Sequence, residues 1–524
     1  MWAYPEIKNV ADIVRYNEKH YGEQTATRFN KHSLSWKDVN RMSSQFANKL
    51  SESGIKAGDR VLYYSGNSHD YFLTIFACAK INAVFIPMNW RLAPEEVSAI
   101  VKDAEPSIVL IEDSFKAVWE EAAKKLNSPI QAVDLQPGIH AENPLWKWFA
   151  DASSDDPKAC CALDSTAWQI YTSGTTGAPK GVEMTHGSIM NMRLCEHLEP
   201  AYTWGPADRY LFCVPSFHLL GLGLSMQAMY NGATIIIAPQ FEPGGVLDII
   251  NNEKPTLAGV APVMIQMLLD HPETEKTDFS SIREIMYAGS PISMGVLKRG
   301  MEKIPCRFMQ FYGSTESGGA ITLLRPDDHD LNNEKRLTSC GKPLPLIEIQ
   351  IIDSNNQALG PNEAGEMLIR LPSIAKSYWR KPEAWNEVYE DGWYRSGDVG
   401  YFDEEGYYYI VDRSKDMIVS GGENIYSTEV ENCLSIHPEI AAAAVIGVPS
   451  EKWGEEVKAF IIPRPACQPD STEIIEFCKS RLAAYKCPKS IEIVEDFPRT
   501  GAGKVSKKDL RAPYWDKNQG RAVS

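Results

Sequence analysis

Hydrophobic and polar positions alternate with two different periods along the chain. Residues 34–59, LSWKDVNRMSSQFANKLSESGIKAGD, have hydrophobic side chains three and four positions apart, which predicts an amphipathic helix that ends at glycines. The runs RVLYYSG (60–66) and VFIPMN (84–89) predict strands, with helix-like residues 71–83 between them. The same alternation returns in GATIIIAP (232–239), PTLAGVAPVMIQMLLDHP (255–272) and SIREIMYAGSPIS (281–293). Helices that alternate with short strands are typical of βαβ units around a mostly parallel sheet.

The pattern changes after about residue 340. Hydrophobic residues then alternate with period two and turn residues separate the runs, which predicts short antiparallel strands and hairpins. These runs are LPLIEIQIID (344–353), GEMLIRLP (365–372) and GYYYIVDRSKDMIVSGGENIY (406–426). They are followed by a predicted helix at 427–440, predicted strands at 442–449 and 456–463, and a predicted helix at 471–484. This last part is typical of a separate small α+β domain.

A chain of 524 residues is too long for a single hydrophobic core, so we expect at least two domains. The predicted fold class is α/β. A large N-terminal domain, residues 1–412, should contain mixed, mostly parallel sheets wrapped by helices plus a β-rich subdomain. Residues 416–524 should form the small α+β domain. The polar sequence DRSKD, from Asp412 to Asp416, is the predicted boundary.

Charge and cysteine content restrict the possible partners and the compartment. The chain has 53 Lys and Arg against 69 Asp and Glu, and the net charge of −16 argues against nucleic acid, because phosphate backbones recruit basic surfaces. The eleven cysteines include no CxxC pair and no zinc spacing, which favours reduced thiols in a cytoplasmic protein. A homodimer is compatible with this sequence.

The sequence predicts no segment that crosses a membrane. The first residues, MWAYPEIKNV, lack a basic region followed by an apolar one, so no signal peptide is expected. The most apolar span, residues 212–239, is interrupted by Pro215, His218 and several glycines, which indicates buried core. Peripheral contact with a membrane surface is compatible with the sequence.

A loop rich in glycine and hydroxyl side chains follows a predicted strand in AWQIYTSGTTGAPKG (167–181). Its hydroxyl and charged side chains are Thr172, Ser173, Thr175, Thr176 and Lys180. Together with backbone N–H groups they are suited to hold a polyphosphate and then release it. The alternative interpretation is a surface linker that is rich in Ser, Thr and Gly.

This loop is not an ordinary P-loop. Lys180 is followed by Gly181 instead of Ser or Thr, and the spacing of the glycines differs. The second candidate, GAGK at 501–504, fails because Val505 follows it. A P-loop ATPase is therefore disfavoured.

Six further motifs follow the loop along the chain. They are PSFHLLG (215–221), YAGSPIS (287–293), QFYGSTESGG (310–319), GWYRSGDVG (392–400), DRSKDMIVSGGENIYSTEVE (412–431) and PRTGAGKVSKKDLR (498–511). With YTSGTTGAPKGV (171–182) they closely resemble, in order, the signatures of the adenylate-forming superfamily. This superfamily includes acyl-CoA synthetases, firefly-luciferase-like enzymes and the adenylation domains of peptide synthetases. The resemblance runs from near the N-terminus to about residue 511.

The resemblance implies two half-reactions at one site. A carboxylate attacks the α-phosphate of ATP to give an acyl-adenylate and pyrophosphate, and the thiol of coenzyme A then displaces AMP. Such chemistry depends on positioning and charge neutralisation. The implied cofactors are ATP, Mg²⁺ and CoA, and the implied substrate is a small carboxylic acid.

The resemblance also assigns nucleotide-binding residues. The phosphate loop would contribute Thr172, Ser173, Gly174, Thr175, Thr176, Gly177 and Lys180, and the rest of the nucleotide would lie against Ala288, Gly289, Gln310, Phe311, Tyr312, Gly313 and Ser314. Thr315 would contact the α-phosphate, and Glu316 would bind Mg²⁺, a cation that prefers oxygen ligands. Asp398 would accept the ribose hydroxyls with help from Arg413, and Ile410 would pack nearby. Glu316 and Asp398 could instead be ordinary turn carboxylates.

The small domain carries the remaining assignments implied by the resemblance. Lys504 would neutralise charge on the α-phosphate during adenylation. Residues 413–415 would be the hinge, with Lys415 as the pivot about which the small domain rotates between half-reactions. Ser420, Gly421, Gly422 and Trp453 would border the CoA tunnel. The alternatives are a solvated surface lysine for Lys504 and a core-filling role for Trp453.

His218 would border the substrate carboxylate and orient it, although a lone histidine among apolar residues is more often a hydrogen-bonded core residue. The candidate segments of the acyl pocket are HLLGLGLSMQAM (218–229), VAPVMIQML (260–268), YAGSPIS and SGGAITLL (317–324). Apart from Glu316 and His218, these segments and their neighbours are expected to lack charge. They contain Met226, Met229, Met264 and Met267, which would either make the pocket adaptable or fill helix cores.

This composition favours an apolar acid: a medium- or long-chain fatty acid, an aryl acid or an alicyclic acid. An amino acid is disfavoured, because its ammonium group would need a buried anion where this chain has His218. Three rivals remain: an adenylate-forming enzyme that uses a carrier protein as acceptor, a luciferase-like oxygenase, and a non-catalytic nucleotide-binding scaffold.

Overall fold

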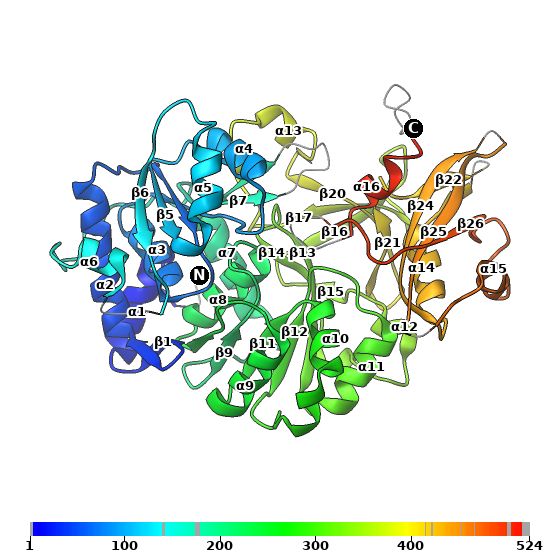
Figure 1. Ribbon diagram of the computed structural model, residues 1–524, viewed down its shortest axis with the longest axis horizontal. Coiled ribbons are helices and arrows are strands. Elements are labelled where there is room, and N and C mark those ends of the chain that lie inside the picture. The colour runs from blue at the N-terminus through cyan, green and yellow to red at the C-terminus, as the bar shows by residue number, and fades with distance from the viewer. Residues whose placement is uncertain are drawn as a thin grey trace.

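The computed structural model describes residues 4–138, 142–172, 179–413, 415–420, 423–450, 452–465, 467–499 and 505–515. Figure 1 shows a large body of sheets and helices on one side and a smaller domain, formed by the C-terminal elements, on the other. The mixed α/β fold class predicted from the sequence is confirmed.

The first sheet of the large body has the strand order β18-β8-β7-β4-β3-β5-β6. The strands are β3 (Arg60–Tyr64), β4 (Val84–Pro87), β5 (Ile108–Glu112), β6 (Gln131–Leu135), β7 (Thr166–Thr172), β8 (Lys180–Thr185) and β18 (Ser377–Tyr378). The pairs from β7 to β6 are parallel, whereas β7 with β8 and β8 with β18 are antiparallel. Continuous burial of β3 and β4 is expected for parallel strands with helices on both faces.

The second sheet has the order β15-β14-β13-β12-β11-β9-β10-β1-β2. The strands are β1 (Thr25–Phe29), β2 (His32–Ser35), β9 (Arg209–Phe212), β10 (Thr234–Ile237), β11 (Leu257–Val260), β12 (Glu284–Tyr287), β13 (Arg307–Ser314), β14 (Gly319–Leu324) and β15 (Lys342–Pro343). Strands β1 and β9 to β13 pair in parallel, and the antiparallel strands are at the two edges.

Helices cover both sheets and also separate them. The helices of the large domain are α1 (Val10–Tyr21), α2 (Trp36–Glu52), α3 (His69–Lys80), α4 (Pro94–Ala104), α5 (Lys116–Ala123), α6 (Pro144–Phe149), α7 (His186–Leu198), α8 (Leu219–Tyr230), α9 (Pro243–Glu253), α10 (Pro262–Asp270), α11 (Met294–Lys303), α12 (Glu334–Leu337) and α13 (Pro382–Asn386). Alternate residues of β9 show the layering: Tyr210 and Phe212 face the core shared with α3, α7 and α8, whereas Leu211 faces the core beneath α9 to α11. Helix α3 is buried on all sides because it lies between the two sheets.

A β-rich subdomain follows, with the strand order β16-β17-β20-β19 and β21 paired to β20. Its strands are β16 (Glu348–Ile352), β17 (Gly365–Arg370), β19 (Tyr389–Glu390), β20 (Trp393–Phe402) and β21 (Tyr408–Arg413). All these pairs are antiparallel, as the period-two pattern predicted.

The small C-terminal domain has its own sheet, β23-β22-β25-β24, with β26 paired to β25. Its elements are β22 (Ile418–Ser420), β23 (Glu423–Ile425), α14 (Ser427–Ser435), β24 (Ile440–Ser450), β25 (Gly454–Pro463), α15 (Ser471–Lys479), β26 (Ser490–Ile493) and α16 (Lys507–Arg511). A separate hydrophobic core forms under this sheet. Within the described ranges, no helix is both long and apolar enough to span a membrane.

Candidate active site

The phosphate loop predicted from the sequence connects β7 to β8. Thr172 and Lys180 are Cα partners in this antiparallel pair, so the strands hold the two ends of the loop together. Ser173, Gly174, Thr175, Thr176 and Gly177 lie outside the described residues.

Lys180 is connected to Glu316 through one aromatic side chain. The Lys180 ammonium lies 4.6 Å from the centre of the Tyr378 ring. The Tyr378 hydroxyl donates a 2.9 Å hydrogen bond to Oε1 of Glu316. Burial and the negative charge of Glu316 raise the pKa of Tyr378 well above its ordinary value, which keeps the hydroxyl a donor. The cation at the end of the loop and the predicted metal ligand therefore contact the same side chain, Lys180 over its ring and Glu316 at its hydroxyl.

Thr315 and Glu316 lie in the tight turn between β13 and β14. The Ser317 hydroxyl donates to the carbonyl oxygens of Ser314 and Gly319, which closes the turn. Gly313 allows the two strands to approach, because a Cβ at this position would lie 2.1 Å from the carbonyl oxygen of Gly319. Thr315 and Glu316 are half-buried, so both side chains face a partly open space.

Magnesium fits this turn only as a cation shared with a phosphate ligand. Among the described residues, no group of three or more His, Cys, Asp and Glu side chains could hold a metal. Glu316 offers a carboxylate, and Tyr378 orients one of its oxygens. A single carboxylate is sufficient for Mg²⁺ when phosphates and water supply the other ligands.

Asp398 joins strand β20 to two other elements. The Tyr312 hydroxyl donates to Oδ2 of Asp398 at 2.6 Å, and Nε of Arg413 lies 2.7 Å from Oδ1. Asp398 is only 5% exposed, and its Cα partner on β21 is Arg413. The charge of Asp398 raises the pKa of the Arg413 guanidinium, while burial and Asp398 raise the pKa of Tyr312. Ile410 is half-buried and is the partner of Gly400 on the same strand pair.

The other predicted nucleotide residues lie at the carboxyl ends of β12 and β13, which are parallel neighbours. Ala288 is half-buried, and the exposed Gly289 has a φ of +92°, a conformation that favours glycine. Gln310 and Ser314 are half-buried on β13. Phe311 is buried and stacks on Tyr202, with 5.8 Å between ring centres. Since alternate residues face opposite sides of a strand, Phe311 points away from Tyr312 and Asp398.

His218 precedes the first residue of α8 and adopts an extended backbone conformation there. Its ring is half-buried and lies edge-on to the ring of Phe217, with 4.4 Å between centres. Leu219, Leu220 and Gly223 on the first turns of α8 are also half-buried, so this end of the helix is not fully covered. Met226 and Met229 are fully buried and fill the core, which was the alternative interpretation for them.

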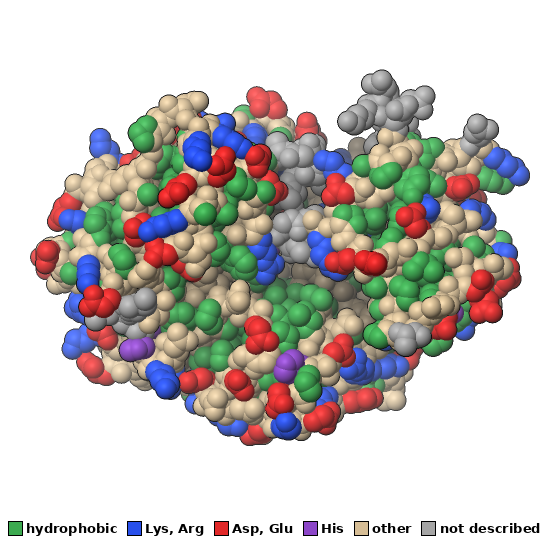
Figure 2. Space-filling model, in the orientation of Figure 1, with side chains coloured by type: hydrophobic (Ala, Val, Ile, Leu, Met, Phe, Trp, Pro, Cys, Tyr) green, Lys and Arg blue, Asp and Glu red, His purple; other side chains and the backbone are tan. Residues whose placement is uncertain are grey.

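A hollow lies between the large and small domains. In Figure 2 it has Lys and Arg side chains at its sides and hydrophobic side chains along its floor, where Figure 1 shows β12 and α10. Val263 and Met267 of α10 are 53% and 44% exposed. One turn separates them, so they form an apolar strip on a single face of this helix.

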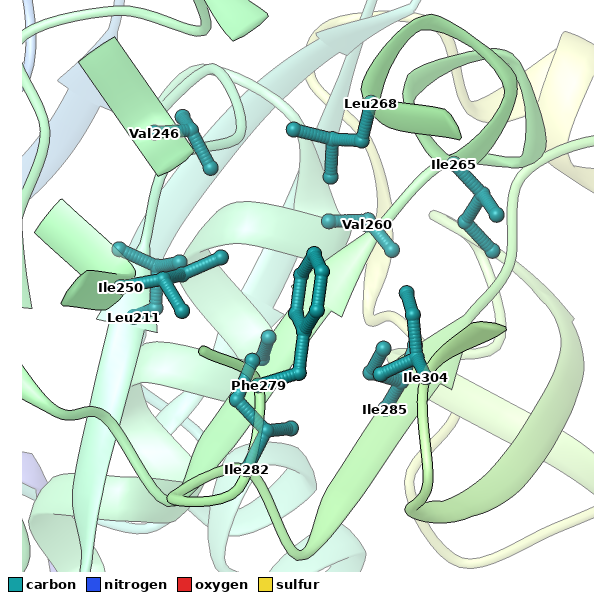
Figure 3. A pocket seen from close by; sticks show the side chains of 11 residues that line it. Leu211, Val246, Ile250, Val260, Ile265, Leu268, Phe279, Ile282, Ile285 and Ile304 are labelled. Atoms are coloured by element: carbon teal, nitrogen blue, oxygen red, sulfur yellow. The ribbon is translucent and has the colours of Figure 1, made fainter. Parts of the chain in front are cut away.

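A small cavity beneath the second sheet is not the acyl pocket. Its volume is about 10 Å³, enough for one water at most. Figure 3 shows its aliphatic side chains pointing toward one another around Phe279. The lining residues are Leu211, Val246, Ile250, Ala258, Val260, Ile265, Leu268, Phe279, Ile282, Ile285 and Ile304. This cavity is a packing defect in the core between β9, β11, β12 and the outer helices.

Among the predicted residues of the hinge and small domain, the structure describes Lys415, Ser420 and Trp453. Arg511 connects α16 to this boundary, because it lies 2.6 Å from Asp416 and donates to the carbonyl oxygen of Lys415. Burial lowers the pKa of Lys415. Ser420 pairs with Gly454, which brings it next to Trp453. Trp453 is 46% exposed, so the alternative that it fills the core is wrong. Gly421, Gly422 and Lys504 lie outside the described residues.

Two features of the site were missed in the sequence. Tyr378 lies in none of the sequence motifs, and only the pairing of β18 with β8 brings it beside Lys180. The expectation that the acyl segments have no charged neighbours is wrong both along the chain, where Arg325 directly follows Leu324, and in space. Arg193 on α7 donates a 2.9 Å hydrogen bond to the carbonyl oxygen of Gly223. No local signal could have shown this contact, because thirty residues separate the two positions.

Comparison with known proteins finds similar enzymes along nearly the whole chain. The pattern of the AMP-binding enzyme family matches residues 14–379, and that of the AMP-binding enzyme C-terminal domain matches residues 429–504. A fatty acid–[acyl-carrier-protein] ligase, ScoC of Streptomyces coeruleorubidus, is 34% identical over 98% of this chain and 98% of its own. A feruloyl-CoA synthase of an Amycolatopsis species is 34% identical over 94% of this chain and 96% of its own.

A solved structure shares the fold across both domains. It is o-succinylbenzoate CoA synthetase (MenE) from Bacillus subtilis in complex with the acyl-adenylate intermediate OSB-AMP. The TM-score is 0.82 and the identity 28%, over 95% of this chain and 97% of that one.

Proposed function

The chain belongs to the AMP-binding enzyme family and is an adenylate-forming enzyme of the acyl-CoA ligase group, and on this premise we propose its acid, its acceptor and its catalytic residues. The enzyme activates an apolar carboxylic acid with ATP and transfers the acyl group to CoA. The observation that carries the proposal is the connection from Lys180 through Tyr378 to Glu316. It joins the phosphate loop to the carboxylate suited to Mg²⁺.

In the first half-reaction, an oxygen of the substrate carboxylate bonds to the α-phosphorus of ATP. The bond from that phosphorus to the bridging oxygen breaks, and pyrophosphate leaves. Thr172 and Lys180 hold the leaving phosphates, and Thr315 contacts the α-phosphate. Mg²⁺, when bound at Glu316, neutralises phosphate charge. Lys504 supplies a second positive charge at the α-phosphate.

The ribose is held by the carboxylate of Asp398, whose orientation is fixed by Tyr312 and Arg413. A carboxylate that already accepts a hydrogen bond from Tyr312 and forms an ion pair with Arg413 is held in place before the nucleotide arrives, which lowers the entropic cost of binding. His218 orients the substrate carboxylate at the start of α8.

In the second half-reaction, the sulfur of CoA bonds to the acyl carbon. The bond from that carbon to the phosphate oxygen breaks, and AMP leaves with both electrons of this bond. The small domain turns about Lys415 to bring Ser420, Gly421, Gly422 and Trp453 to the CoA tunnel. Asp416 and Arg511 both belong to the small domain, so their contact turns with it.

The acid is a medium- or long-chain fatty acid, an aryl acid or an alicyclic acid. Support comes from the apolar face of α8 and from the exposed Val263 and Met267 on α10. A second acceptor is favoured by one observation: the similar ScoC is named a fatty acid–[acyl-carrier-protein] ligase. A phosphopantetheine thiol is common to CoA and holo-carrier proteins, so either would enter the same tunnel.

The test measures pyrophosphate and AMP release with ATP and Mg²⁺ across a panel of carboxylic acids. Each acid is assayed with no acceptor, with CoA and with a holo-acyl carrier protein. CoA-dependent AMP release with an apolar acid supports the proposal. AMP release that requires the carrier protein favours the second acceptor, and best turnover with acetate or an amino acid contradicts the proposed acid class.

A further inference from the structure

A polar network lies behind the two strand ends that flank the phosphate loop. Asp103, near the end of α4, accepts a 2.7 Å hydrogen bond from the hydroxyl of Tyr171 on β7. The other carboxylate oxygen of Asp103 lies 3.0 Å from Nζ of Lys381, and this ammonium also donates to the carbonyl oxygen of Pro179 at 2.6 Å. Asp103, Lys381 and Tyr171, here termed the loop anchor, therefore connect both sides of the loop through one carboxylate.

The loop anchor reaches the neighbours of the residues proposed to hold phosphates. Tyr171 directly precedes Thr172, and Pro179 directly precedes Lys180. Thr172 and Lys180 are Cα partners at the ends of β7 and β8, so their side chains share one face of this strand pair. Since alternate residues of a strand face opposite sides, Tyr171 points to the other face. The loop anchor can therefore act on Thr172 and Lys180 only through the backbone.

These strand ends extend past their neighbours in the sheet. Among the described residues, β4 pairs with β7 at Trp168, and β18 pairs with β8 as far as Val182. One further backbone hydrogen bond reaches the carbonyl oxygen of Gly181, from the N–H of Trp379. Pairs at the end of a strand ladder open more readily than pairs inside it. Side chains that support Lys180 from behind therefore have the largest effect at this position.

The loop anchor is itself held in place. The backbone carbonyl of Asp103 accepts a 2.9 Å hydrogen bond from the indole of Trp379, whose ring centre lies 4.1 Å from the Arg60 guanidinium. Burial and the neighbouring carboxylate raise the pKa of Tyr171, which keeps its hydroxyl a donor. The side chains of Lys381 and Asp103 are 29% and 19% exposed, so salt screens this ion pair less than it screens a pair on the open surface.

Gly181 gives the Tyr171 ring room to reach α4. The two residues are Cα partners on β8 and β7. A Cβ at Gly181 would lie 2.7 Å from Nε2 of Gln169 and 3.0 Å from Cζ of Tyr171. Gln169 also donates a 2.9 Å hydrogen bond to the Tyr171 hydroxyl. Glycine at this position therefore allows the ring to lie beside β8 with its hydroxyl directed to Asp103.

The alternative is that the ion pair only holds α4 against α13, which lie near each other at the edge of the large domain (Figure 1). A second ion pair joins the same two segments, because Nη1 of Arg380 lies 2.6 Å from Oε1 of Glu105. In the described structure the side chains of this second pair make no hydrogen bond to β7 or β8. The hydrogen bond to Pro179 distinguishes Lys381 from its neighbour Arg380.

We infer that Asp103, Lys381 and Tyr171 are positioning residues for ATP, which hold Thr172 and Lys180 in the arrangement that binds the leaving phosphates. They act without touching the nucleotide. This inference rests on the proposed function, because that function assigns the leaving phosphates to Thr172 and Lys180. Adenylation should therefore depend on the loop anchor, whereas thioester formation from acyl-AMP should not, since acyl-AMP lacks these phosphates.

The test compares ATP with AMP in two variants, Lys381→Met and Tyr171→Phe. Calorimetry gives the Kd of each nucleotide, pyrophosphate release with the best acid gives kcat/KM for ATP, and synthetic acyl-AMP isolates thioester formation. Lys381→Met should weaken ATP binding and lower kcat/KM for ATP, each by about tenfold, because a small displacement of the phosphate-binding groups is costly. Its AMP affinity and its thioester formation should stay within about twofold of the wild type. Tyr171→Phe keeps the contact of Lys381 with Pro179 and should lose less, about threefold.

Two further variants serve as rescue and control. Lys381→Arg should restore kcat/KM for ATP to within about threefold of the wild type, because a guanidinium can donate both to Asp103 and to the carbonyl oxygen of Pro179. Arg380→Met is the matched control. It removes the neighbouring ion pair with Glu105 and should leave kcat/KM for ATP at the wild-type value.

Three results would overturn the inference: a kcat/KM for ATP that neither Lys381→Met nor Tyr171→Phe changes, equal losses in both half-reactions, or the same loss in Arg380→Met. The last two would assign these residues a general structural role. Failure of the proposed function would show separately, as a wild type that releases pyrophosphate with no acid, or as a Lys180→Met variant with the wild-type ratio of ATP to AMP affinity. Where only the acid or the acceptor is wrong, that affinity ratio in Lys381→Met still decides the inference.

Discussion

The hydroxyl of Tyr312 donates a hydrogen bond of 2.6 Å to the carboxylate of Asp398, although the two residues are 86 positions apart in the chain. Tyr312 belongs to the second sheet of the large body, and Asp398 to the β-rich subdomain. Arg413 adds a second contact to the same carboxylate at 2.7 Å. Three motifs of the sequence therefore meet at one buried carboxylate, at the end of the large domain that faces the small one.

Asp398→Ala should weaken nucleotide binding by about 10- to 100-fold, because hydrogen bonds to a charged group are worth about 1.5–3 kcal/mol. Calorimetric titration with ATP and with AMP would measure the loss. Tyr312→Phe keeps the carboxylate and should cost less than Asp398→Ala. Unchanged AMP affinity in Asp398→Ala would contradict the ribose-binding role.

Glu316→Gln should lower the rate of adenylation by about 100-fold. The neutral amide holds Mg²⁺ less tightly than the carboxylate does, so the cation neutralises less of the phosphate charge. The measurement is ATP–pyrophosphate exchange as a function of Mg²⁺ concentration. Tyr378→Phe removes only the group that orients Glu316, and its activity should fall by about tenfold and recover partly at high Mg²⁺. A Glu316→Gln variant with the wild-type Mg²⁺ dependence would argue for a turn carboxylate with no ligand.

Lys504→Ala should reduce acyl-adenylate formation by about 100-fold or more while largely sparing thioester formation from supplied acyl-AMP. The reason is that its positive charge is needed only when the α-phosphate is attacked. The two half-reactions are measured separately, by pyrophosphate exchange and by thioester formation from synthetic acyl-AMP. Lys508→Ala, at a nearby lysine on α16, is the matched control. Equal losses in both half-reactions would contradict the rotation of the small domain about Lys415.

Asp70 should make the stability of the protein depend on pH. Burial raises the pKa of this carboxyl from 3.8 to about 6, although Asn143 and Trp146 donate hydrogen bonds to it. Between these two values the folded state binds more protons than the unfolded state. The contribution of protonated Asp70 to the free energy of unfolding is therefore present at low pH, and it is lost as the pH rises from about 4 to about 6. The shift corresponds to about 3 kcal/mol of unfolding free energy.

Asp70→Asn cannot ionise, so its loss of stability between about pH 4 and about pH 7 should be smaller than that of the wild type, by up to about 3 kcal/mol. Urea unfolding at both pH values would measure the difference. Asp151→Asn, at an exposed position, should keep the wild-type dependence. A wild-type pH dependence in Asp70→Asn would show that another group is responsible.

Much of the fold follows from local pattern. The predicted helix at 34–59 contains α2, and the predicted strands 60–66 and 84–89 contain β3 and β4. Those predictions are confirmed because the helical period of α2 shows its buried face, and the continuous apolar runs of β3 and β4 are typical of strands that are buried on both faces. The sequence placed Phe311 beside Tyr312 in the nucleotide site. Adjacency in the chain does not show that the two rings face opposite sides of β13, where Phe311 stacks on Tyr202 and Tyr312 contacts Asp398.

The sequence by itself determined the family and predicted the chemical groups of the candidate site. Motifs such as QFYGSTE and the loop before Lys180 hold their reactive residues within a few positions of each other, so local spacing is enough to identify them. The tertiary structure decided what these groups touch. Tyr378 reaches Glu316 through the pairing of β18 with β8, and Arg193 reaches Gly223 through the packing of α7 near α8. Such contacts join residues far apart in the chain. A local sequence pattern does not show which distant residue will be the partner, because that depends on how the layers pack.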